Sequence, residues 1–225
     1  TVVSHRSGET EDTTIADLAV ALMLDCARNV TFMNNSIKAG KQERPSGLEM
    51  WEKTLGVVGA GRIGKGVARR CKGFQMRILC YDQFQDQAFA DEVGATYVDF
   101  DTLVRESDFI TLHSPLTPET ENMFSTAQFA AMKDTAILVN TARGGIVDEA
   151  ALYEALKSGQ LSAAAMDVVV SEPMPKDHPL LTLDQVVVTP HIGMYSEEAI
   201  EAVSMICAEN AAALLTGAEM KFVVK

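Results

Sequence analysis

The chain has 225 residues, of which 47% are hydrophobic and 22% charged, and its formal net charge is −12 at pH 7. This length allows one large domain, or one domain and part of a second. An acidic chain repels phosphate backbones and anionic lipids, so we expect neither a nucleic-acid nor a membrane partner. No segment that is typical of a signal peptide opens the sequence, and no apolar run reaches the ~18 residues that a membrane span needs. Its four cysteines have no metal-ligand spacing, so we expect a cytoplasmic protein with reduced thiols and no metal site.

Short β-branched runs alternate with helical patterns from residue 54 to residue 190. The predicted strands are Thr54–Gly59, Met76–Tyr81, Phe109–Leu112, Ala136–Val139, Ala163–Val169 and Val186–Val188. Helices are expected between most of them, notably over Gly61–Lys72 and Glu149–Lys157. Apolar strands separated by helices indicate an α/β fold, a doubly wound parallel sheet with helices on both faces.

Two long helices flank this unit. The first is predicted over Thr14–Val30, with Thr14 and Asp17 as a capping-box-like start. It is apolar around most of its circumference, so we expect it to be buried in the core or at a subunit contact. The second is predicted over Ser196–Leu215, and the polar segment Asn34–Gly47 is predicted to be a loop.

The segment 59–64, GAGRIG, fits the GxGxxG pattern at the point where a predicted strand passes into a predicted helix. Such glycines let the backbone turn tightly and approach a pyrophosphate, and the helix N-terminus adds N–H groups and a positive dipole. A tight turn without a ligand would have the same pattern, but this context favours a dinucleotide. The contacts expected here come from Gly59, Gly61, Arg62, Ile63 and Gly64.

Asp82 ends the second strand, about 20 residues past the last glycine, where an acidic residue binds a ribose 2′-hydroxyl. Residues 83–86 contain no Lys or Arg to neutralise a 2′-phosphate, which favours NAD over NADP. A solvated Asp at a strand end is the alternative. We therefore expect a Rossmann NAD-binding domain over 31–190, an N-terminal arm and crossover helix over 1–30, and a C-terminal helix and tail over 191–225.

Four histidines occur in the chain: His5, His113, His178 and His191. His113 and His191 follow predicted strands, at the edge where parallel sheets bind their ligands. His178 lies in a proline-rich loop and is expected to be solvated.

Three segments resemble the signature regions of the D-isomer-specific 2-hydroxyacid dehydrogenases: 140–148 (NTARGGIVD), 166–173 and 189–193 (TPHIG). The resemblance implies a catalytic triad of Arg143, Glu172 and His191, with Asp167 holding the nicotinamide amide. The further cofactor contacts that it implies come from His113, Ser114, Pro115, Asn140, Thr141, Ala142 and Gly193. The stretch 194–198 (MYSEE) also resembles the branch that contains the C-terminal-binding proteins.

The residue types suit this chemistry. Reduction of a 2-keto acid needs a hydride at the carbonyl carbon and a proton at the oxygen, and histidine can give a proton near neutral pH. Glu172 would orient His191, and Arg143 would bind the substrate carboxylate bidentately. A surface ion pair between Arg143 and Glu172 is the alternative.

The N-terminal region does not fit the family. In the family a substrate domain precedes the long helix, whereas here only about thirteen residues do, and the chain begins with Thr1, so we expect a fragment with that domain largely missing. Residues 2–20 resemble enolase, in which the Arg6 and Ser7 positions contact a phosphate. No other segment does, so no enolase activity is inferred. We interpret the chain as a chimera or engineered minimal domain, the alternative being a natural short homologue.

The sequence thus predicts the NAD(H)-binding domain of a D-2-hydroxyacid dehydrogenase, acting on a small 2-keto or 2-hydroxy acid as a homodimer. The alternative is a truncated or engineered NAD-binding module, or a corepressor-like interaction protein, with little or no turnover. The sequence does not name the substrate.

Overall fold

The computed structural model describes residues 9–220, with side chains from residue 13 onward. Residues 1–8 of the predicted N-terminal arm, including the enolase-like Arg6 and Ser7, lie outside the described residues. The core of the described structure is one sheet whose strands are all parallel, in the order β3-β2-β1-β4-β5-β6-β7. The strands are β1 Thr54–Val58, β2 Arg77–Tyr81, β3 Ala95–Tyr97, β4 Phe109–Leu112, β5 Ile137–Asn140, β6 Ala163–Met166 and β7 Val186–Val188. The order reverses between β1 and β4, which confirms the predicted doubly wound Rossmann fold.

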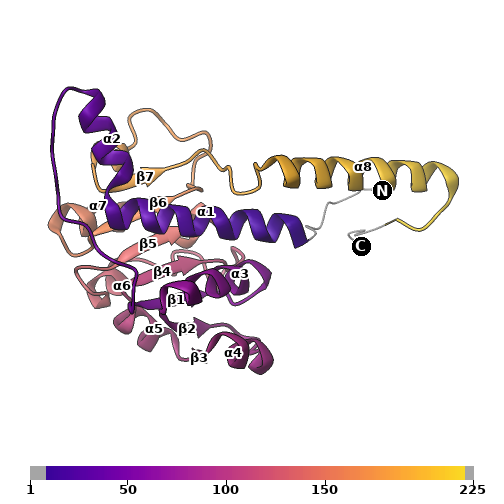
Figure 1. Ribbon diagram of the computed structural model, residues 1–225, viewed down its shortest axis with the longest axis horizontal. Coiled ribbons are helices and arrows are strands. Elements are labelled where there is room, and N and C mark those ends of the chain that lie inside the picture. Colours follow the sequence, from indigo (N-terminus) through magenta and orange to yellow (C-terminus); the bar gives the residue numbers. More distant parts are fainter. Residues whose placement is uncertain (1–8, 221–225) are drawn as a thin grey trace.

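Helices cover both faces of the sheet (Figure 1). They are α1 Glu9–Arg28, α2 Val30–Lys38, α3 Arg62–Cys71, α4 Gln87–Val93, α5 Phe100–Glu106, α6 Thr126–Ala131, α7 Glu149–Ser158 and α8 Glu197–Thr216, with short 3₁₀ turns η1 Lys72–Phe74, η2 Gly144–Ile146 and η3 Pro179–Thr182. Alternate strand residues enter opposite hydrophobic cores, because successive side chains in a strand point to opposite faces. In β5, Ile137 and Val139 join the core under α1, α3 and α4, whereas Leu138 joins the core under α5, α6 and α7.

Helix α1 packs across α3 and the strands β5, β6 and β7. The residues Ala16, Ala19 and Met23 are fully buried along this contact. The prediction that this apolar helix packs against the Rossmann unit is therefore confirmed. The predicted start was wrong, because the helix begins at Glu9 and the Thr14 hydroxyl instead bonds the Ser196 hydroxyl at 2.9 Å.

The predicted loop Asn34–Gly47 is helical over its first residues, since α2 continues to Lys38. Asp25 at the end of α1 accepts hydrogen bonds from the backbone N–H and the hydroxyl of Thr31, which supports the first turn of α2. Asn and Ser are poor helix formers in isolation, so the polar segment gave no helical signal. The strand predicted over Ala163–Val169 also ends early, at Met166.

Helix α8 confirms the second long helix. Ser196 caps it by accepting the Ala199 N–H, and Gly217 ends it in the left-handed conformation at φ +73°. Figure 1 shows α8 running outward from the sheet, and within residues 197–216 only Ala199 and Asn210 are buried. Among the described residues, α8 is the one helix whose length and apolar composition would allow it to cross a membrane. Its glutamates interrupt the apolar run, so the sequence pattern did not indicate it.

Candidate functional site

The predicted site residues gather at one edge of the sheet, because each follows the carboxyl end of a parallel strand. Gly59 follows β1, Asp82 follows β2 and His113 follows β4. The segment 141–143 follows β5, and Asp167 follows β6. His191 comes three residues after β7.

The fold explains the need for glycine at only two of the three glycine positions in the GxGxxG loop. Gly59 has φ +91°, and a Cβ there would lie 2.7 Å from the backbone of Ser114. A Cβ at Gly64 would lie 2.2 Å from the Gly59 carbonyl oxygen, because α3 packs tightly on β1. A Cβ at Gly61 would meet nothing within 4 Å. The fold itself therefore needs Gly59 and Gly64, whereas Gly61 leaves open space where a pyrophosphate would approach.

This open space continues into a hollow of about 630 Å³. It is lined by Gly59, Gly61, Tyr81, Asp82, Gln83, Phe84, His113, Ser114, Pro115, Thr117, Glu119, Thr120 and Met123. Helix α3 begins at Arg62, followed by Ile63, and its N-cap Gly61 has no side chain to occupy the first N–H groups. Asp82 uses Oδ1 to accept the Phe84 N–H at 2.8 Å, and Oδ2 has no bond to residues 9–220. The residues present thus fit a dinucleotide, with no Lys or Arg in the lining to neutralise a 2′-phosphate.

His113 lies at the inner wall of this hollow. Its Nε2 is 2.8 Å from the Thr111 hydroxyl, and its Nδ1 is 3.5 Å from the Thr141 hydroxyl. Burial lowers the pKa of His113 to about 3. The ring therefore stays neutral at physiological pH and is unsuited to donate a proton from the imidazolium form.

The turn that carries Arg143 is held by Asn140, which is fully buried. Its Oδ1 accepts the Ala142 N–H at 3.0 Å, and its Nδ2 donates to the Arg143 carbonyl at 2.9 Å. The Arg143 side chain is exposed, and among residues 9–220 it bonds only the Ala142 carbonyl, at 2.6 Å. The alternative ion pair between Arg143 and Glu172 does not form, so the guanidinium can reach a bound anion.

Asp167 is 2% exposed and organises the segment after β7. Its Oδ1 accepts from the Thr189 hydroxyl at 2.6 Å and from the Ile192 N–H at 2.9 Å, and its Oδ2 accepts from the Gly193 N–H at 2.9 Å. The Asp167 carbonyl accepts the His191 N–H at 2.8 Å. His191 has φ +55°, an unusual conformation for a residue with a side chain. This network therefore fixes the backbone of the histidine.

His191 and Glu172 are in direct contact, with Nδ1 donating to Oε2 at 2.8 Å. This hydrogen bond is the main reason that the pKa of Glu172 lies below its ordinary value. The contact orients the ring and leaves Nε2 without a partner among residues 9–220. Both side chains line a second hollow of about 570 Å³.

Sequence reasoning missed several residues of this edge. Thr111 and Thr189 bond His113 and Asp167, but each looks like an ordinary strand threonine in the sequence. His178 was expected to be solvated, which is wrong: its side chain is 15% exposed and Nε2 lies 3.2 Å from Glu149 Oε2. No sequence signal connects residues 149 and 178.

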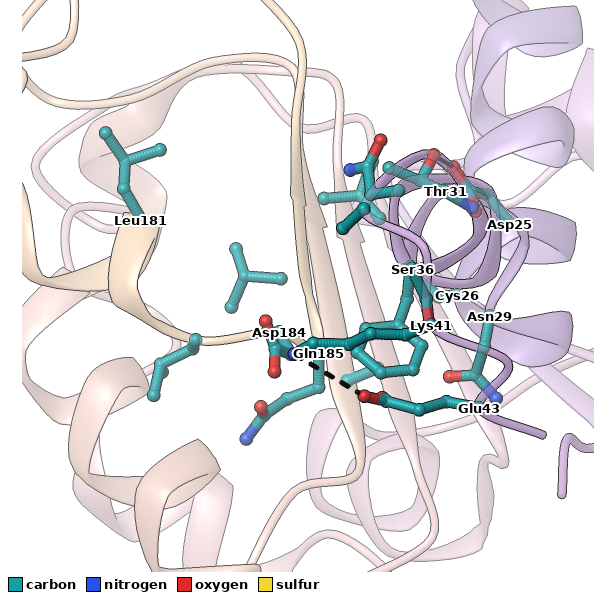
Figure 2. Close-up of a pocket in the computed structure, with 17 residues that line it drawn as sticks. Asp25, Cys26, Asn29, Thr31, Ser36, Lys41, Glu43, Leu181, Asp184 and Gln185 are labelled. Carbon is teal, nitrogen blue, oxygen red and sulfur yellow. Dashed lines mark hydrogen bonds and ion pairs between the residues drawn. The ribbon is translucent and has the colours of Figure 1, made fainter. Parts of the chain in front are cut away.

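A third hollow, of about 360 Å³, lies at the opposite edge of the sheet. Figure 2 shows it between the end of α1, helix α2 and the segment before β7, with Asp25, Ser36 and Gln185 among its walls. Its strand residues are Ala163, Val186 and Val187, at the amino ends of β6 and β7. None of the predicted site residues lines it, so it is not part of the candidate site.

Residues 20–193 match the D-isomer specific 2-hydroxyacid dehydrogenase, NAD-binding domain. The chain belongs to this family. It is 50% identical to a D-3-phosphoglycerate dehydrogenase of Archaeoglobus fulgidus over 93% of this chain and 40% of that protein. It is 45% identical to a glyoxylate reductase of Korarchaeum cryptofilum over 96% of this chain and 66% of that protein. The chain thus spans less than half of the first relative and about two thirds of the second.

Solved structures agree with this assignment. The D-lactate dehydrogenase of Lactobacillus jensenii with NAD⁺ superposes with a TM-score of 0.89 at 32% identity, over 100% of this chain and 72% of that one. The chain therefore carries the NAD-binding domain of a D-2-hydroxyacid dehydrogenase, and NAD is its cofactor. Residues 1–35 separately match the C-terminal TIM-barrel domain of enolase, in agreement with the resemblance in the sequence.

Proposed function

We propose that this chain transfers a hydride between NADH and a small 2-keto acid, forming a D-2-hydroxy acid. The observation that carries the proposal is the 2.8 Å hydrogen bond from His191 Nδ1 to Glu172 Oε2, together with an Arg143 guanidinium that forms no ion pair within residues 9–220. The names of the relatives, glyoxylate reductase and D-3-phosphoglycerate dehydrogenase among them, support the same substrate class.

Each member of the triad has one role in this proposal. Arg143 binds the substrate carboxylate and polarises the keto oxygen, because a guanidinium can donate two parallel hydrogen bonds. Glu172 accepts from Nδ1 of His191, which directs Nε2 to the substrate. His191 then gives its Nε2 proton to the developing alkoxide. Bound NADH supplies the hydride.

The cofactor is proposed to lie along the glycine loop with its adenosine ribose at Asp82. The Oδ2 atom of Asp82, which has no partner among residues 9–220 and could accept from a ribose hydroxyl, supports this, as does the space at Gly61. The nicotinamide end would reach the edge formed by His113, Thr141 and Gly193, with Asp167 close by. Because Asp167 already accepts three hydrogen bonds, its contact with the amide would be an additional one.

We propose that the 225-residue polypeptide alone turns over slowly. The apolar side chains of α8 are largely exposed, with Leu215 at 87% and Met205 at 56%, as expected for a helix that packs on a substrate domain. Because Arg143 is exposed in the described residues, water competes for its guanidinium and the substrate is positioned poorly, and good positioning is worth ~7–11 kcal/mol of barrier in well-oriented systems.

The test pairs binding with turnover. NADH affinity is measured by fluorescence, and kcat/KM is measured with glyoxylate, pyruvate and hydroxypyruvate. We expect tight NADH binding with kcat/KM below the ~10⁴ M⁻¹s⁻¹ of an ordinary enzyme. A kcat/KM above this value would refute the proposal that the polypeptide turns over slowly. The absence of any turnover with NADH bound would refute the proposed hydride transfer. Arg143→Lys should raise KM, since it removes the bidentate contact.

The N-terminal enolase match also supports a chimera joined within α1, since the two family matches overlap over residues 20–35. An uninterrupted reading frame in genomic DNA of the source would contradict this proposal. The stretch 194–198 supports placement beside the C-terminal-binding proteins, and hence a corepressor-like alternative. Binding of a protein partner without turnover on the keto-acid panel would favour that alternative.

A further inference from the structure

The loop that carries Glu172 is buried at Val168 and Val169 but exposed from Val170 to Pro173. It runs from residue 167, after β6, to residue 178, before η3, and contains no helix or strand. The Glu172 side chain is 39% exposed, so packing does not fix it. Within the loop its Oε1 accepts the Val169 N–H, at a long 3.2 Å. A carboxylate that orients a catalytic histidine needs a better support than this.

That support comes from the first residue of α7. Glu149 Oε1 accepts the Val170 N–H at 2.8 Å, and its Oε2 accepts from His178 Nε2 at 3.2 Å. One carboxylate thus bonds the loop two residues before Glu172 and six residues after it. The side chains of Glu149 and His178 are 13% and 15% exposed, so solvent competes little for these bonds.

The bonding pattern of His178 leaves one arrangement of its proton. The Leu180 N–H donates to Nδ1 at 3.3 Å, so Nδ1 is an acceptor and the proton lies on Nε2. Nε2 then donates to Glu149, and all the polar atoms of the pair have partners. A glutamine at position 149 has only one side-chain oxygen. If that oxygen accepts the Val170 N–H, the amide N–H groups face the Nε2–H of His178, and if it accepts from His178, the Val170 bond is lost. Glutamine therefore cannot replace the carboxylate.

The same peptide also contacts the turn of the triad arginine. A Cβ at Gly144 would lie 2.0 Å from the Val169 carbonyl carbon and 2.4 Å from the Val170 nitrogen. The Val169–Val170 peptide is therefore pressed against the residue that follows Arg143. A shift of this peptide would move Glu172 and Arg143 together.

We propose that Glu149 and His178 are positioning residues, which clamp the 167–178 loop and thereby hold Glu172 against His191. The proposal rests on the hydride-transfer function proposed above. Glu149 and His178 are outside the triad, but in this proposal they determine how the proton donor His191 is oriented.

The first test is a kinetic double-mutant cycle in the full chain. Glu149→Gln should lower kcat by about 10- to 100-fold, the size of effect expected when a catalytic group is misplaced by ~1 Å, and leave NADH affinity unchanged. Glu172→Gln removes the group through which the clamp acts, so Glu149→Gln should add less than about twofold in that background. Glu154→Gln, an exposed position on the same helix, is the matched control. Full additivity of the two substitutions would overturn the proposal.

The second test does not depend on turnover. The ring resonances of His191 are followed by NMR in the NADH-bound chain, and are assigned by the loss of signal in His191→Ala. In Glu149→Gln and in His178→Ala they should move toward their positions in Glu172→Gln, whereas Glu154→Gln should leave them in place. Unchanged His191 resonances in either clamp variant, with native thermal unfolding, would overturn the proposal. Absent turnover in the unaltered chain would refute only the proposed function.

Discussion

Substitution of the loop glycines by alanine separates what the fold needs from what the cofactor needs. In Gly64→Ala the new Cβ would meet the Gly59 carbonyl oxygen at 2.2 Å and a methyl of Val57 at 2.9 Å. Gly59 lies in the turn after β1 and Gly64 lies in the first turn of α3, so the backbone must move by roughly 1 Å to relieve the contact. Overpacking of this kind costs about 1–3 kcal/mol. For a domain of this size we expect a Tm lower by about 2–4 °C per kcal/mol.

Gly61→Ala should behave in the opposite way. The added Cβ meets no protein atom within 4 Å, and the backbone there, at φ −73°, suits alanine. Loss of a glycine N-cap and the lower entropy of the unfolded chain act in opposite directions, so stability should change by less than about 1 kcal/mol. A methyl forced against a bound pyrophosphate should instead weaken NADH affinity by about tenfold or more.

The assays are thermal unfolding without cofactor and NADH titration by fluorescence. Gly73→Ala is the control, since a Cβ at this 3₁₀ position also meets nothing within 4 Å but lies away from the loop. Native NADH affinity in Gly61→Ala would refute the reasoning that this glycine reserves space for the pyrophosphate. Native stability in Gly64→Ala would refute the assigned packing role.

Three further results are expected from the cofactor, the acid and the thiols, and one from assembly. Asp82→Ala with Gln83→Arg should narrow or reverse the preference for NADH over NADPH in parallel titrations; tighter NADPH binding by the unaltered chain would contradict the role of Asp82. His191→Ala should lower kcat by roughly 10²- to 10⁴-fold with NADH binding retained, and an unchanged rate would mean that another group is the acid. A thiol reagent near pH 8 should modify Cys207 alone in the folded chain, because burial raises the pKa of the other three thiols to about 12; rapid loss of all four would contradict this. Sedimentation at micromolar concentration should give a dimer with α1 at the contact, and a clean monomer would refute that part.

The sequence predicted the fold wherever hydrophobic periodicity was strong. β1, β4 and β7 were found nearly residue for residue, because each is a short apolar run; β1 and β4 are buried, and β7 at the sheet edge is half-buried. Strand β3, only Ala95–Tyr97, carries no such run and was not predicted. Helix α2 was missed because Asp25 supports its first turn from another helix, a contact that composition does not reveal.

The candidate site was predictable to a similar extent. GxGxxG and the family motifs indicated which residues follow which strand, so their gathering at one edge could be expected. The supports could not be predicted, since each joins residues far apart in sequence. Asp167 bonds a segment more than twenty residues away, and Glu149 bonds His178 at a separation of 29. Such pairs become visible only when strand order and loop paths are known.

The hydroxyl bond between Thr14 and Ser196 has a consequence for how this domain can be combined with others. It joins α1, through which the backbone enters the sheet, to the N-cap of α8, through which the backbone leaves it. The segments that lead into and out of the sheet are therefore joined by one hydrogen bond, although Thr14 and Ser196 are 182 residues apart in the sequence. A unit with adjacent ends can be inserted into a surface loop of another protein with short linkers and little strain. Gene fusion or recombination at these two helices would thus exchange the whole cofactor-binding unit without opening its core.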